Sequence, residues 1–178
     1  MPETAEATLN GLHPDKLEAV IASLKEPDVL KAISGPWRAR MVWENGFKHK
    51  GHMRTHTIEY DEIAELDTQD TAHTPGEALL AALGGCMMVG FVLNATRQGV
   101  TIHDLEIAVE GNFNNLGKWL EVSDEGHPGY NDITAKVYVR ADADEETLQD
   151  IWQKAVDGSP VAQTVCRGTP LVAEFEAI

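Results

Sequence analysis

The residue of this chain best suited to covalent chemistry is Cys86, in the middle of an uncharged run from Ala78 to Ala95. A cysteine thiolate is a nucleophile, so a thiol with open space beside it can attack a bound electrophile. The alanines and glycines of the run leave such space around the sulfur. Free cysteine is also among the residue types most often buried as a small apolar side chain. The run therefore predicts either a pocket thiol or a core thiol.

The segment around this cysteine carries the signals of a long helix. Thr74 is a good N-cap, Pro75 suits the first helical position, and Glu77 at the third position completes a capping box. The helix should run to about Gln98, where Gly99 supplies a left-handed terminator. Because apolar or small residues cover every side, we expect the helix to be buried in a core or an oligomer interface.

The same uncharged run is long enough to suggest a membrane span. However, glycines and Asn94 interrupt it, acidic residues precede it, and only Arg97 follows it closely as a cation. The amphipathic segments on both sides of the run also need an apolar core to pack against. We therefore expect a core helix and no membrane partner.

Before this helix, the sequence predicts two short helices and then strands. Apolar residues recur at helical spacing over residues 14–33, and Pro27 should divide that stretch in two. From Trp37 to Trp43 the period changes to two, which is typical of a strand. A turn at Asn45-Gly46 then leads to a second strand at about Gly51–Tyr60.

After the helix, strands are predicted at about Leu105–Asn112 and Ile133–Ala141, separated by a loop rich in glycine and asparagine. An amphipathic helix follows over Asp144–Val156, and Ser159 should cap another short helix. Leu171–Phe175 reads as a closing strand. The predicted fold class is α+β.

Composition limits the function. The chain has 178 residues and a formal net charge of −15 without a basic stripe, so nucleic acid is not an expected partner. Two cysteines are too few for a secreted disulfide framework. The sequence begins Met-Pro-Glu-Thr and shows no basic segment leading into an apolar one, so no signal peptide is predicted. We expect a cytoplasmic protein with a small ligand.

His49, His52 and His56 lie close together in the sequence and could suggest a metal site. Their spacing matches no helical pair or zinc finger, and no cysteine lies nearby. On one strand, His52 and His56 would share a face while His49 would point the other way. Exposed strand histidines are the simpler interpretation, and no metal or cofactor is predicted.

The pattern P-x-E-x-L-L-A-A-L-G-G-C, from Pro75 to Cys86, resembles the osmotically induced protein C and organic hydroperoxide resistance family (OsmC/Ohr). A strand, a helix and Ser159-Pro160-Val161 follow in the family's order. The resemblance covers about residues 37–178 and leaves residues 1–36 as an N-terminal helical extension. It implies antiparallel sheets around buried central helices in an intertwined homodimer, and cysteine-based reduction of organic hydroperoxides.

The family's active residues are only partly present. Its attacking cysteine falls on Cys86, but the second cysteine, which forms a disulfide with the first, is replaced by Ser159. Its glutamate falls on Gly76, so Glu77 is assigned to the capping box. Cys166 is a poor substitute for the second cysteine. In a helix it would lie about 10 Å beyond Ser159 along the axis, whereas a disulfide needs Cα atoms within about 7 Å.

A free thiol titrates near 8.5, and the helix dipole acts only within the first turn, so a cation is needed to favour the thiolate. The family's arginine falls near Phe47, and Lys48 is the nearest cation. Arg54 and Arg38 are further candidates on the N-terminal strands. Cys86, Lys48 and Arg54 are therefore the predicted catalytic residues.

Two functions are compatible with the sequence. The first is a thiol-dependent hydroperoxide reductase that uses Cys86 alone, with an external thiol completing turnover. The second is a binding protein of the same fold that has lost the peroxidase and holds an apolar small molecule at the dimer interface.

Overall fold

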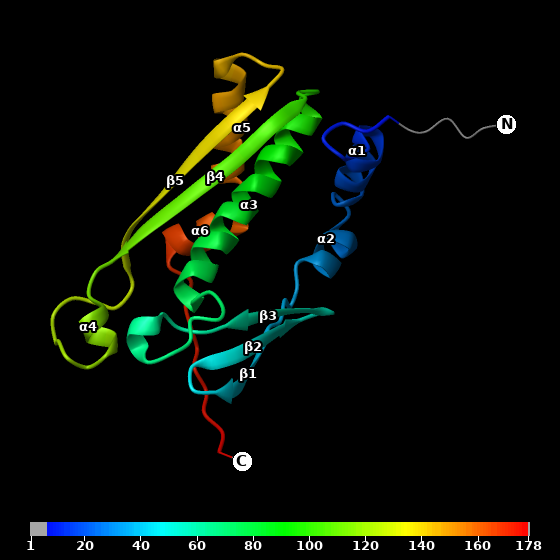
Figure 1. The fold of residues 1–178 in the computed structure, drawn as a ribbon. Helices are drawn as coiled ribbons and strands as arrows, with labels where there is room; N and C mark the ends of the chain where they lie inside the picture. Colours follow the sequence, from blue (N-terminus) through cyan, green and yellow to red (C-terminus); the bar gives the residue numbers. More distant parts are fainter. Residues whose placement is uncertain (1–6, 178) are drawn as a thin grey trace. The chain divides into compact units, whose positions relative to one another are not determined.

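The computed structural model describes residues 7–177 (Figure 1). The chain divides into two compact units, Met1–Ala81 and Ala82–Ile178. Residues 1–6, which include the Met-Pro-Glu-Thr start used to predict that no signal peptide is present, lie outside the described part. The division of the sequence into an extension, 1–36, and a main domain, 37–178, stays a prediction.

The first unit begins with the two predicted helices, α1 (Pro14–Ser23) and α2 (Pro27–Ile33). Each starts at a proline, which loses nothing at the first helical position because that N–H has no helical partner. Neither helix contains a buried residue, and large apolar side chains such as Leu30 and Ile33 remain exposed.

An antiparallel sheet follows, with β1 (Arg40–Asn45), β2 (Lys48–Met53) and β3 (His56–Tyr60) in that order. The predicted turn between the first two strands is confirmed, and Gly46 has a positive φ of 56°. Trp37, expected to start the first strand, precedes it and is exposed.

The single strand predicted over Gly51–Tyr60 is wrong, because the chain reverses inside it. Met53 pairs with His56 across a tight turn, and Arg54 adopts a positive φ of 55°. Only glycine and asparagine adopt that conformation readily, so an arginine gives no sequence signal for the turn. His52 and His56 consequently lie on different strands and do not share one strand face as expected.

The long helix α3 (Pro75–Arg97) begins with the predicted capping box. The Thr74 N–H donates to Glu77 Oε2 at 2.8 Å, and the Glu77 N–H donates to Thr74 Oγ1 at 3.1 Å. These reciprocal bonds satisfy two backbone N–H groups that have no hydrogen-bond partner within the helix. The assignment of Glu77 to the helix start is therefore confirmed.

The second unit is built on a long antiparallel hairpin, β4 (Ile102–Phe113) and β5 (Tyr130–Ala141). A loop with the short helix α4 (Leu116–Trp119) joins the two strands. Helices α5 (Glu145–Asp157) and α6 (Pro160–Arg167) follow the hairpin. These elements confirm the predicted α+β class.

One face of α3 packs on the hairpin and on α5 and α6 (Figure 1). Phe91 and Ile151 are fully buried in one cluster, and Met87 packs with Ala162 in another. Gly90 allows α3 to approach the backbone of α5 closely, because a Cβ added there would lie 3.1 Å from the Ala155 Cα.

The other face of α3 is uncovered within the second unit, where Val89 is 69% exposed. The second unit by itself therefore does not provide the burial expected on every side of the helix. Among residues 7–177, α3 is long and apolar enough to cross a membrane by length and composition, although core helices also meet that test. Its packing on the hairpin and α5 is that of a core helix.

The closing strand predicted at Leu171–Phe175 is wrong for this chain. The segment after α6 has no regular structure up to residue 177, and Leu171 and Phe175 are 90% and 94% exposed. Alternating apolar residues form a strand only when a neighbouring strand edge is available to pair with them.

Gly90→Ala should destabilise the fold by about 1–3 kcal/mol, because the new methyl group would meet the backbone of Ala155. Gly85→Ala is the matched control, since a Cβ there meets nothing within 4 Å. Denaturant unfolding monitored by circular dichroism gives both values. Equal stability of Gly90→Ala and the unsubstituted chain would contradict the close approach.

Glu77→Ala should lower the free energy of unfolding by about 0.5–2 kcal/mol, because it removes half of the capping box. Glu77→Gln, which can still accept from the Thr74 N–H, should retain most of that stability. Alkylation of Cys86 should be nearly unchanged in both variants. A slower alkylation without a change in Tm would instead connect Glu77 to the thiol.

Candidate functional site

Cys86 lies midway along α3, in the second unit, and is a half-buried free thiol. Its neighbours Gly84 and Met87 are buried on the packed face of the helix. On its other side, Gly85 is exposed and faces open space within this chain. The sulfur is thus at the border between the packed and the open face of α3, which is compatible with a reactive thiol.

Ser159 shows what replaces the second family cysteine. Its side chain is buried, and its hydroxyl oxygen accepts from the Ala162 N–H at 3.2 Å as the N-cap of α6. Cys166 lies later in the same helix and is an exposed free thiol. The predicted capping by Ser159 is confirmed, and the two cysteines are separate thiols in this structure.

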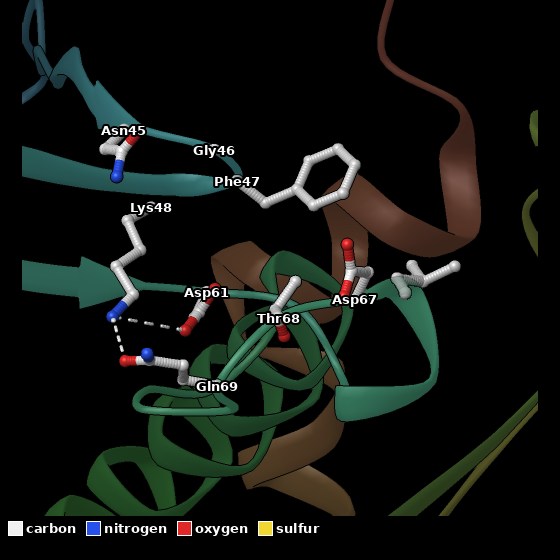
Figure 2. A pocket seen from close by; sticks show the side chains of 9 residues that line it. Asn45, Gly46, Phe47, Lys48, Asp61, Asp67, Thr68 and Gln69 are labelled. Carbon is white, nitrogen blue, oxygen red and sulfur yellow. Dashed lines mark hydrogen bonds and ion pairs between the residues drawn. The ribbon is translucent and has the colours of Figure 1, made fainter.

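Lys48 is held inside the first unit, at the start of β2. Its ammonium lies 4.0 Å from Asp61 Oδ2 and 3.5 Å from Gln69 Oε1 (Figure 2). Both contacts are long, and the Lys48 side chain is 36% exposed, so its ammonium can still donate to a ligand. The other predicted cation, Arg54, occupies the turn between β2 and β3 and is exposed.

Asp61 is the buried charge of this unit, with 1% of its surface exposed. Its carboxylate accepts from the Glu62 N–H at 3.0 Å, the Thr71 N–H at 3.0 Å and the Thr71 hydroxyl at 2.8 Å. The Thr71 backbone bond is the main cause that lowers the pKa of Asp61 below its usual range. Burial opposes this shift, while the other hydrogen bonds and Lys48 add to it. No sequence pattern indicates this site, because Asp61 lies in an irregular acidic stretch.

A cavity of about 370 Å³ lies beside these groups. It is formed by the β1–β2 turn, residues 45–48, and by Asp61 with the loop residues 66–69. In Figure 2, Lys48, Asp61 and Gln69 gather at one end. Sequence reasoning missed the cavity, since a turn and an irregular loop have no periodic pattern.

Two histidines of this unit contact the ring of Tyr60. His49 stacks on Tyr60 with ring centroids 4.9 Å apart, and its Nδ1 lies 2.8 Å from the Phe47 carbonyl oxygen. His73 meets Tyr60 edge to face. Within residues 7–177, no group of three or more histidine, cysteine or carboxylate side chains is arranged to hold a metal ion.

Asp61→Asn should lower Tm most at neutral pH. Because the folded-state pKa is lowered, the carboxylate stabilises the fold above the usual Asp range of about 3.9, and this contribution is lost as pH falls through the folded-state pKa. The Tm values of the variant and the unsubstituted chain should therefore converge as the pH falls below the usual Asp range. Thr71→Val, which removes one donor, should show a smaller effect of the same sign. Parallel Tm curves from pH 7 downward would contradict this role.

Comparison with known proteins places the fold and the Cys86 motif in one family. The OsmC-like protein family matches residues 68–174. The fold is similar to an OsmC-like protein from Mycoplasma pneumoniae, with 18% identity and a TM-score of 0.64, covering 76% of this chain and 90% of that chain. No curated protein sequence matches this chain.

Two further solved structures share the fold at low identity. One is an OsmC-like protein of unknown function from Vibrio cholerae, with 14% identity, a TM-score of 0.60, and coverage of 73% of this chain and 93% of that chain. The other is an organic hydroperoxide resistance protein OsmC from Legionella pneumophila, with 12% identity, a TM-score of 0.56, and coverage of 76% and 93%. The family match covers more than half of the residues, and these folds agree with it. The chain belongs to the OsmC-like protein family.

Proposed function

We propose that this protein reduces organic hydroperoxides through Cys86 alone. The observation that carries the proposal is the position of Cys86, a half-buried free thiol at the end of the family motif on α3. Structural neighbours described as organic hydroperoxide resistance proteins support it. Identity to those proteins is only 12%, so the activity has to be tested on this chain.

The chemistry is a two-electron reduction. The Cys86 thiolate attacks one peroxide oxygen, the O–O bond breaks, and the alkoxide takes a proton to leave as an alcohol. Cys86 is left as a sulfenic acid. An external thiol then forms a mixed disulfide and releases water, and a second thiol restores Cys86 and leaves as part of a disulfide.

An external reductant is required because Ser159 cannot form a disulfide and is occupied as the N-cap of α6. Cys166, on the exposed surface of that helix, is assigned no catalytic role. A reducing compartment such as the cytoplasm would supply the thiol and keep both cysteines reduced. Lys48 and Arg54 are the proposed cations that favour the thiolate.

The alternative is a binding protein that holds an apolar small molecule. The uncovered face of α3, with Leu79 and Val89 exposed, is the observation that favours it. In that case the same fold would bind its ligand without any reaction at Cys86.

We also propose a homodimer, as the family resemblance implies. Only 28% of the most apolar window of α3 is buried within the chain, so a second copy would cover surface that is otherwise left in water. The exposed apolar residues of the C-terminal segment, such as Leu171 and Phe175, add to that uncovered surface.

Sedimentation velocity at micromolar concentration should show a dimer. Val89→Glu should shift it toward monomer, because a charge would be placed on the apolar face of α3. Val122→Glu is the matched control, since Val122 is also highly exposed but lies in the β4–β5 loop. A cooperatively folded monomer for the unsubstituted chain would refute the dimer.

One equivalent of cumene hydroperoxide should add a single oxygen at Cys86 without forming a disulfide to Cys166. Intact mass under non-reducing conditions, after alkylation of free thiols, measures both outcomes. Cys86→Ser should abolish the reaction, and Cys166→Ser should leave it unchanged. A product that takes up no alkylating agent and is about two mass units lighter than the reduced, unalkylated protein would show an intramolecular disulfide instead.

The same reaction separates the two functions and tests the cations. No peroxide consumption by the reduced protein would favour the binding protein. If Lys48 or Arg54 favours the thiolate, Lys48→Met or Arg54→Met should slow both peroxide consumption and alkylation of Cys86 by iodoacetamide at neutral pH. Equal rates in both variants would remove these residues from the catalytic set.

A further inference from the structure

The cavity in the first unit has a polar end whose cation is available. The Lys48 ammonium has three donors, and its two protein contacts, at 3.5 and 4.0 Å, are both long. Asp61 behind it is 1% exposed and already accepts three hydrogen bonds from its own unit. A ligand entering the cavity therefore meets the ammonium of Lys48, and an anionic oxygen is the group that fits there.

The rest of the cavity lining is suited to a ligand that carries a positive charge and an apolar group. Phe47 and Leu66 supply apolar surface, and Asp67 adds a carboxylate. Figure 2 shows Phe47 and Asp67 away from the end at which Lys48 meets Gln69. Among residues 7–177, the Asp67 side chain has no hydrogen bond or ion pair. A ligand ammonium could pair with Asp67 and lie against the Phe47 ring.

The loop that carries Asp67 is held in place by its own hydrogen bonds. The Thr68 hydroxyl donates to the carbonyl oxygens of Glu62 at 2.6 Å and Ile63 at 3.1 Å. Asp67 follows a short 3₁₀ helix, Ala64–Leu66, and has a positive φ of 59°. Since the loop is ordered by contacts within itself, a ligand need not order it on binding.

We propose that this cavity binds a short zwitterion of the size of a dipeptide, with its carboxylate on Lys48 and its ammonium on Asp67. The volume of about 370 Å³ lies within the range of small-molecule sites. Asn45 and Gln69 also line the cavity, and their side-chain amides can donate to and accept from a peptide group. The combined charges of Lys48, Asp61 and Asp67 disfavour a simple anion. This binding does not depend on the thiol chemistry of Cys86.

Isothermal titration with L-alanyl-L-alanine tests the site. Saturable binding is expected with a Kd of about 1 mM or below, weakened by high salt. Lys48→Met and Asp67→Asn should each weaken binding about tenfold or more, because each removes one charge contact. Cys86→Ser should bind with unchanged affinity, which separates this site from the proposed peroxidase.

Blocked probes identify which end of the ligand each residue holds. N-acetyl-alanyl-alanine lacks the ammonium, so its weaker binding should not fall further in Asp67→Asn. Alanyl-alanine amide lacks the carboxylate, so its binding should not fall further in Lys48→Met. The proposal would be overturned if the unblocked dipeptide showed no saturable binding. It would also be overturned if Lys48→Met and Asp67→Asn each weakened the binding of both blocked dipeptides by the same factor.

Discussion

The packing of α3 against the hairpin and α5 is the contact on which the second unit depends. Gly90 lets the two helices approach until backbone meets backbone, and Phe91 and Ile151 fill the space beside that contact. Because side chains in such a core are closely packed, the position of α3 also fixes the height and direction of Cys86. The thiol is placed by the packing of the helix, and within residues 7–177 no hydrogen bond holds its sulfur.

Local signals in the sequence were sufficient for the elements that depend on local chemistry. The capping box at Thr74 and Glu77, the split at Pro27 and the N-cap at Ser159 each rest on residues close to one another in the chain. Their hydrogen bonds follow from residue type and spacing, so they could be predicted without knowledge of the fold. The long hairpin was also predicted, although its strands extend further than their apolar patterns.

The errors have a different physical origin. The reversal at Arg54 needs a positive φ that arginine does not signal, and the C-terminal alternation of apolar residues cannot form a strand without a partner edge. The cavity was missed for a related reason, because it depends on Asp61 accepting from Thr71, ten residues later in an irregular loop. Cys86 can be predicted as a candidate from its surroundings in the sequence, whereas Lys48 and Arg54 stay predictions, because the position of a residue on a strand does not give its distance from a thiol.

The residue at position 159 affects both the stability of α6 and the source of the thiol that would reduce Cys86. Serine and cysteine differ by one atom, and the same position either caps α6 with oxygen or, in the two-cysteine chemistry that the family resemblance implies, supplies a sulfur for a disulfide. If the protein reduces peroxides as proposed, an oxygen at this position means that the electrons must come from thiols in solution, and the rate would depend on their concentration. A protein built in this way would report on thiol supply as well as on peroxide, and one substitution could remove that dependence.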